Sequence, residues 1–227
     1  MAFDVLDEHE QGELVQKWLR ENALSIATGI VLGLVLLFGW QQWKAHRARH
    51  AGEAATQYQA LVDAIDAKHT DDAHTIADAL RKDYADSAYA VFAAMRSAEM
   101  SSSSGDLKAA ADDLAWAQDH AGTPALKSLA AIDLARVRLA SGDADAALKI
   151  VDALPKDSYA AIAGELRGDI LAKLGRTDDA RKAYQDALSH LDAQAPNRSF
   201  VQMKLDDLGA LPAASAAPST PAETSGS

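Results

Sequence analysis

The side chains in this sequence that could do chemistry are histidines and carboxylates, and their spacing favours solvated surface groups. His46 and His50 lie four residues apart, a spacing that two metal-binding imidazoles could use, but no third ligand is near them. Because they stand among basic residues after an apolar segment, contact with lipid headgroups is the favoured interpretation. Two histidines and two aspartates within residues 69–74 surround a predicted helix break, where solvated side chains are expected.

No constellation of catalytic or cofactor-binding residues is present in the sequence. The P-loop, dinucleotide-binding, nucleophile-elbow and zinc-protease motifs are missing. Without cysteine, the chain has no thiol chemistry, thiolate metal site or disulfide. Adjacent acids, such as Asp112 with Asp113 and Asp206 with Asp207, are expected on exposed helix faces. We therefore expect no catalytic residue, no metal and no cofactor, in a protein that is not an enzyme.

The composition favours closely packed helices and argues against nucleic acid as a partner. The 227 residues are 48% hydrophobic, and only 6% are aromatic, a balance that suits helix packing better than strands. The formal net charge is −11, whereas phosphate contacts need clustered cations. No sustained period-two alternation is present, so the part of the chain after residue 51 is predicted to be all-α.

One segment is apolar enough to cross a membrane. Residues 23–40 carry no charge and would form a helix about 27 Å long, close to the thickness of the hydrocarbon core of a bilayer. Trp18 precedes the segment, and Trp40 and Trp43 close it, as is typical of membrane-interface aromatics. A buried core helix is the alternative. A cleaved signal peptide is not favoured, because the preceding residues are mainly acidic and bulky residues stand where cleavage needs small ones.

The flanks of this segment leave its orientation open. Lys44 and Arg47 belong to a basic collar, residues 44–50, which we expect at the membrane interface. The numbers of Lys and Arg near the two ends differ by one, which does not decide which side is inside. Gly29 and Gly33 form a G-x-x-x-G pattern, equally compatible with a helix-packing face and with the ordinary small residues of such helices.

An internal repeat begins after residue 52. Gly105, Gly142 and Gly175 each separate two helical segments, 37 and 33 residues apart. Each glycine has a small residue seven positions before it, alanine five positions after it and a large residue nine positions after it. These residues are Ala98, Ala135 and Gly168, then Ala110, Ala147 and Ala180, then Leu114, Val151 and Tyr184. Small side chains would let antiparallel helices approach, and glycine permits the turn. The arrangement resembles the tetratricopeptide repeat, which implies an α-solenoid of helix hairpins.

Two of the predicted helix starts carry capping signals. Thr123 precedes Pro124, as an N-cap precedes a first-turn proline. Thr177 precedes two aspartates, which suit the positive end of a helix. We therefore predict both threonines as N-caps.

These observations divide the chain into five parts. We expect a short acidic amphipathic tail at residues 1–21, a transmembrane helix at 22–43, a basic juxtamembrane linker at 44–51, a tetratricopeptide-like repeat domain at 52–209 and a disordered Ala/Pro/Ser/Thr tail at 210–227. The amphipathic tail is interpreted as a solvated lead-in to the membrane or, alternatively, as a docking segment.

The repeats predict a partner-binding surface. Stacked hairpins form a curved surface whose inner face, from the first helix of each hairpin, commonly binds peptide or protein segments. The register of the three glycines places ten residues on that face: Phe92, Met95, Glu99, Leu129, Ile132, Arg136, Ile162, Glu165, Asp169 and Lys173. An apolar floor with mixed charges suits a helix or an extended segment of another protein. The alternative is that the apolar members of the first two helices belong to the core.

A set of short motifs spread over residues 8–208 has the pattern of a known family. They lie at 10–11, 13–14, 17–18 and 21–22 in the tail, at 39–40 and 43 at the end of the apolar segment, and at 58–59, 134–137, 159–162, 166–169 and 203–205 in the repeat region. Together they closely resemble the YfgM-type ancillary subunits of the bacterial SecYEG translocon, a tetratricopeptide-repeat family.

The resemblance implies a single-pass protein of the bacterial inner membrane, with a cytoplasmic N-terminus and a periplasmic repeat domain. Members of this family associate with the SecYEG translocon and with a membrane-anchored periplasmic chaperone related to prolyl isomerases, and assist the handover of translocated chains. Some restrain a cytoplasmic stress-response regulator, which would give the N-terminal tail a partner besides the lipid bilayer. The alternative function is a tetratricopeptide scaffold for envelope assembly or regulation that is independent of Sec.

Overall fold

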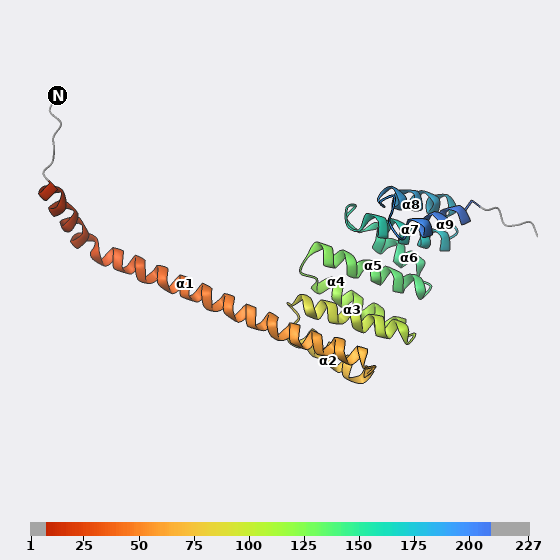
Figure 1. Ribbon diagram of the computed structural model, residues 1–227, viewed down its shortest axis with the longest axis horizontal. Helices are drawn as coiled ribbons and strands as arrows, with labels where there is room; N and C mark the ends of the chain where they lie inside the picture. The colour runs from red at the N-terminus through yellow and green to blue at the C-terminus, as the bar shows by residue number, and fades with distance from the viewer. Residues whose placement is uncertain (1–7, 210–227) are drawn as a thin grey trace, which may run out of the picture. The chain divides into compact units, whose positions relative to one another are not determined.

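The computed structural model describes residues 8–209, leaving out the side chains of residues 8–14 and 26 (Figure 1). Within this range the chain forms nine α-helices and no strand, which confirms the all-α prediction for the described residues. The helices are α1 (Glu8–Asp66), α2 (Thr70–Asp83), α3 (Ala88–Ser103), α4 (Leu107–His120), α5 (Pro124–Ala140), α6 (Ala144–Asp152), α7 (Ala160–Lys173), α8 (Thr177–Ser189) and α9 (Arg198–Asp207). The predicted disordered tail at 210–227 lies outside the described residues.

The chain divides into two compact units, the first ending at Glu53 and the second beginning at Ala54. In the first unit α1 is continuous through the basic collar, so residues 44–51 are helical. Among the described side chains from Leu24 to Trp43, the large apolar ones other than that of residue 26 are each at least half exposed. No single described helix has the length and hydropathy of a membrane span, but Val15–Ser25 and Ala27–Asp66, bent by 49° at their junction, meet those criteria as a pair. The transmembrane helix at 22–43 therefore stays a prediction.

The second unit is a series of helix hairpins. The end of α1 pairs with α2, and Leu61, Ala77 and Leu80 are fully buried in their shared core. The pairs α3–α4, α5–α6 and α7–α8 follow, each packed on the preceding pair, and α9 packs on α8 (Figure 1). Val201 of α9 is fully buried in the cluster formed by α5 to α8. The helix closes the last hairpin by covering apolar side chains that would otherwise face water.

The predicted repeat register is reproduced in the structure. Gly105, Gly142 and Gly175 have φ values of +87°, +89° and +73°, a conformation that residues with a side chain rarely adopt. The three alanines that lie five positions after these glycines are fully buried. The large residues nine positions after the glycines are at most 6% exposed. The small residues therefore lie at the helix crossings.

One close crossing joins α7 and α8. A Cβ atom on Gly168 would lie 2.4 Å from Cε1 of Tyr184, and one on Gly164 would lie 3.2 Å from Cβ of Ala187. Tyr184 is only 3% exposed. The absence of a side chain at residue 168 is what lets the Tyr184 ring lie against α7.

Side-chain caps fix several helix starts, and one capping prediction is wrong. Thr123 accepts a hydrogen bond from the Leu126 backbone N at 3.2 Å, as predicted. Thr177 is instead the first residue of α8, and the capping position is Arg176, which makes no side-chain cap. After Gly105 and Gly142 the next residue is an aspartate that caps the following helix, whereas Gly175 is followed by arginine.

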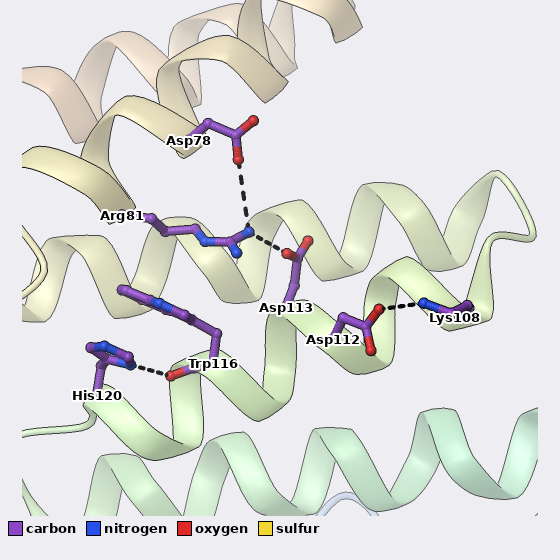
Figure 2. A network of polar contacts seen from close by, with 7 residues as sticks. All are labelled: Asp78, Arg81, Lys108, Asp112, Asp113, Trp116 and His120. Carbon is purple, nitrogen blue, oxygen red and sulfur yellow. Dashed lines mark hydrogen bonds and ion pairs between the residues drawn. The ribbon is translucent and has the colours of Figure 1, made fainter.

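A polar network links the first two hairpins of the second unit (Figure 2). Arg81 of α2 donates a hydrogen bond to the Asp113 carboxylate of α4, and its guanidinium lies 5.2 Å from the centre of the Trp116 ring. Trp116 in turn stacks on His120 at 4.0 Å. Asp113 is 8% exposed, which corrects the expectation of an exposed acid pair. Only Asp112 is exposed, where it accepts a hydrogen bond from Lys108 at 2.8 Å.

Candidate protein-binding groove

A cavity of about 590 Å³ lies on the first helices of consecutive hairpins, and we name it the α3–α5 groove. Its walls come mainly from α3 and α5, with Tyr58 from the end of α1 and Leu114 from α4. These first helices are the ones that the repeat register predicted to form the inner face. The groove lies entirely within the second unit of the chain.

One wall of the groove is aromatic. The Tyr58 ring lies 5.8 Å from the Tyr89 ring and 6.1 Å from the Phe92 ring, centre to centre. Phe92 is 37% exposed, and Met95 beside it is half-buried. Partly exposed aromatic and methionine side chains can gain buried area when a partner covers them, which is typical of the centre of a protein interface.

The lining of the groove also carries two ion pairs, with the arginine first in sequence on α3 and the acid first on α5. On α3 the Arg96 guanidinium donates to Glu99 at 2.8 Å, and on α5 the Arg136 guanidinium donates to Asp133 at 2.7 Å. The pKa of Arg96 is raised above its ordinary value, mainly by its hydrogen bond to Glu99 and secondly by its hydrogen bond to Tyr58. Because the pairs are largely exposed, each stabilises the fold by at most about 1 kcal/mol. Their charges are therefore available to a partner at little cost to the fold.

Four of the ten predicted groove residues line the cavity: Phe92, Met95, Glu99 and Arg136. Ile132 does not, because it is fully buried in the cluster that joins α5 to the later helices. The core alternative therefore holds for Ile132, which corrects its placement on the inner face. Leu129 is half-buried outside the cavity lining, and Ile162 packs on the same cluster as Ile132.

Two predicted groove residues on α7, Glu165 and Asp169, are bound by other side chains of this chain. Lys204 of α9 donates to Glu165 at 2.8 Å and to both carboxylate oxygens of Asp169 at 2.8 Å. Tyr184 also donates to Asp169, at 2.7 Å. Lys173 is exposed at the C-terminal end of α7. The inner-face acids of α7 thus hold α9 in place.

This ionic cluster changes two proton affinities. Burial, followed by the hydrogen bond to Asp169, raises the pKa of Tyr184 above its ordinary range. Burial alone would lower the pKa of Lys204, but its hydrogen bonds to Asp169 and Glu165 outweigh burial, so that its pKa is raised as well. Both groups keep their protons at neutral pH.

Several residues of the groove and the cluster were not predicted. Tyr58, Arg96 and Asp133 line the cavity, and Lys204 neutralises the acids of α7. A charge of opposite sign three residues away was a usable signal for Arg96 and Asp133. No sequence signal links Lys204 to residues that lie more than thirty positions earlier.

The predicted membrane-interface residues lie in the first unit. The rings of Trp40 and Trp43 are 5.4 Å apart, and the Arg47 guanidinium lies 4.9 Å from the centre of the Trp43 ring. Trp18 is 57% exposed, and Lys44 is exposed.

The remaining predicted sites have no ligand or partner among the described residues. A Cβ atom built on Gly29 or Gly33 would meet no atom within 4 Å, so no packing partner for these two glycines comes from the described chain. Among the side chains described over residues 15–209 there is also no group of three or more His, Asp or Glu residues that could hold a metal ion.

Comparison with known proteins covers both units of the chain. The family described as tetratricopeptide repeat-like domain matches residues 16–210. A protein of Escherichia coli (strain K12) named ancillary SecYEG translocon subunit is 30% identical over 202 residues, which are 89% of this chain and 97% of that protein. Proteins of the same name from Haemophilus influenzae and Aggregatibacter actinomycetemcomitans are 28% and 27% identical, over 92% of this chain and the whole of each relative. The chain therefore belongs to the family of ancillary SecYEG translocon subunits, which carry a tetratricopeptide repeat-like domain.

Proposed function

We propose that this protein is a membrane-anchored, non-catalytic subunit that associates with the SecYEG translocon and uses its repeat domain to bind a second protein. The observation that supports the proposal is the α3–α5 groove. It combines an aromatic wall with exposed ion pairs whose charges a partner can bind. Such a surface suits a helix or an extended polypeptide segment and offers no arrangement for bond-breaking chemistry.

Association with the translocon is supported by the names of the relatives and by how much of the chain they match. The family match begins at residue 16, before the apolar segment, and continues through the whole repeat domain. The match therefore includes the proposed anchor as well as the hairpins. This coverage supports a membrane-anchored subunit of the kind that the relatives' name describes.

The proposed topology is a single span in the bacterial inner membrane, with the N-terminus in the cytoplasm and the repeat domain in the periplasm. The exposed apolar side chains of residues 24–43 support it, because a helix that exposes Leu, Ile, Val, Phe and Trp on all sides is stable in lipid and costly in water. Alkaline phosphatase fused after Gly209 would be active in this topology. An inactive fusion, together with an active cytoplasmic reporter at the same site, would reverse the orientation.

The proposed occupant of the groove is a membrane-anchored periplasmic chaperone related to prolyl isomerases, to which the translocon hands emerging chains. A cytoplasmic stress-response regulator is the proposed partner of the N-terminal tail. Both assignments rest on the family resemblance, whereas the groove supplies only the chemistry of the contact.

The test is site-specific photo-crosslinking in cells. A photoreactive residue at Phe92, in the groove, should capture the chaperone, and one at Gln185, exposed on α8, should not. Co-purification of the full chain should recover the translocon. Recovery of envelope-assembly factors without the translocon or the chaperone would contradict the proposal and favour a Sec-independent scaffold.

A further inference from the structure

The stretch of α1 that follows the apolar segment is rich in positive charge, and the first acid after it is Glu53, four residues beyond Arg49. Lys44, Arg47 and Arg49 lie in the basic collar, and no Asp or Glu occurs from residue 22 to residue 52, although the whole chain has a net charge of −11. The side chains of residues 44–49 are exposed. The collar is therefore a local positive surface on an acidic protein.

The helix geometry spreads these charges around the axis. At about 100° per residue, Lys44 and Arg47 lie about 60° apart on one face of α1, and Arg49 projects from nearly the opposite side. Along the axis they cover about 7.5 Å, which is close to the thickness of the headgroup layer on one side of a bilayer. His46 and His50 stack one turn apart in the same collar, with ring centres 6.4 Å apart.

The tryptophans place these cations at the edge of the apolar segment. Trp43 holds the Arg47 guanidinium over its ring at 4.9 Å, and Trp40 packs against Trp43 at 5.4 Å. An indole at the membrane interface would thus orient an arginine at the depth of the lipid phosphates. A guanidinium can donate two parallel hydrogen bonds to a phosphate.

We propose that the basic collar binds the headgroup phosphates of anionic phospholipids. This inference rests on the proposed membrane anchor. In the proposed topology the collar lies on the periplasmic side. Lys and Arg next to membrane spans are enriched on the cytoplasmic side, so that enrichment does not account for the three cations of the collar. Attraction to anionic headgroups does account for them, and fixes the depth at which α1 leaves the hydrocarbon core.

The other flank of the apolar segment provides a matched control. Lys17 and Arg20 are exposed there, but Glu21 lies next to them. Replacing Lys17 and Arg20 with glutamine removes two cations without touching the collar. Replacing Lys44, Arg47 and Arg49 with glutamine removes the collar's fixed charge and leaves the apolar segment unchanged.

The experiment uses the full chain with Trp18→Phe, reconstituted in bilayers that contain brominated phospholipid. Bromine quenches the fluorescence of tryptophans that touch the lipid, here Trp40 and Trp43. We expect brominated phosphatidylglycerol to quench more than brominated phosphatidylcholine, and this preference to weaken about fivefold for each collar cation removed. The Lys17→Gln/Arg20→Gln variant should keep the preference.

The outcomes separate the inference from the proposed function on which it rests. Equal quenching by the two lipids would show an inserted helix and would overturn lipid selectivity alone. Quenching by neither lipid would overturn the membrane anchor and the collar's role together. Loss of the preference on adding inorganic phosphate, but not chloride at the same ionic strength, would assign the collar to free anions and overturn its assignment to lipid.

Discussion

At the scale of single residues, the repeat register places side chains on a helix face but does not tell groove from core. Met95 and Ile132 lie at the same distance before Gly105 and Gly142. Met95 lines the groove, whereas Ile132 is fully buried because the cluster that extends from α5 to α9 covers it. Equivalent positions therefore differ because the next hairpin covers one and not the other, and this depends on tertiary packing.

This difference predicts opposite effects for two substitutions. Phe92→Glu should abolish co-purification of the groove partner and leave the melting temperature nearly unchanged, because Phe92 is 37% exposed. Ile132→Ala should destabilise the fold by about 2–4 kcal/mol, because it opens a cavity in the core. Thermal melting by circular dichroism measures the second effect. Parallel losses of helicity in both variants would place Phe92 in the core.

The ionic cluster of α7, α8 and α9 predicts a loss of stability at alkaline pH. The pKa of Tyr184 and that of Lys204 are both raised on folding, from ordinary values of 10.0 and 10.5. The folded state therefore holds these protons more strongly, and their contribution to stability is complete below pH 10 and declines as the pH rises above it. The melting temperature should be flat from pH 7 to 9 and fall above pH 10.

A variant isolates the tyrosine's share of this effect. Tyr184→Phe should lower the melting temperature at pH 8, because it removes the hydrogen bond to Asp169. It should also make the alkaline decline shallower, since only Lys204 then titrates. An unchanged slope above pH 10 would show that the Tyr184 proton does not contribute.

At the scale of helices, the sequence predicts where hairpins turn and where helices cross, because both depend on local chemistry. A φ near +90° favours glycine, and a close crossing favours small residues, so Gly105, Gly142 and Gly168 are readable from spacing alone. The burial of Asp113 was not predictable. It depends on Arg81, thirty-two positions earlier, reaching across from α2.

The crossing of α7 and α8 should not tolerate a side chain at residue 168. Gly168→Ala places a methyl group against the Tyr184 ring and should destabilise the fold by about 1–3 kcal/mol. Adding Tyr184→Ala removes the clash, so the double variant should lose less stability than the sum of the single variants. Denaturant unfolding of the four proteins measures this coupling. Simple additivity would mean that α7 and α8 adjust independently of the ring.

The Arg81–Asp113 contact should stabilise the junction of the first two hairpins of the second unit. Arg81→Met leaves the buried carboxylate without its charged partner and should cost about 3 kcal/mol. The Lys108–Asp112 pair is fully exposed, so Lys108→Met is the matched control and should not change the melting temperature. If the two variants melted alike, the Arg81–Asp113 contact would not stabilise this junction.

At the scale of the whole molecule, stability and membrane attachment should belong to different parts of the chain. Each of the four buried apolar clusters consists of residues from Ala54 onward. The first unit contributes exposed apolar side chains and the basic collar instead. An anchor that takes no part in the core can hold the repeat domain at the bilayer without altering the groove.

This separation predicts that residues 51–209 fold without the anchor. The fragment should be soluble and helical and melt cooperatively, because no buried cluster is cut. It should still be captured through Phe92 but should not associate with phospholipid vesicles, since the exposed apolar segment is missing. Circular dichroism, crosslinking and vesicle flotation measure the three properties, with the full chain in detergent as the reference. A fragment that is helical but melts without cooperativity would mean that α1 before residue 51 contributes to the core, and the two parts would then be one folding unit.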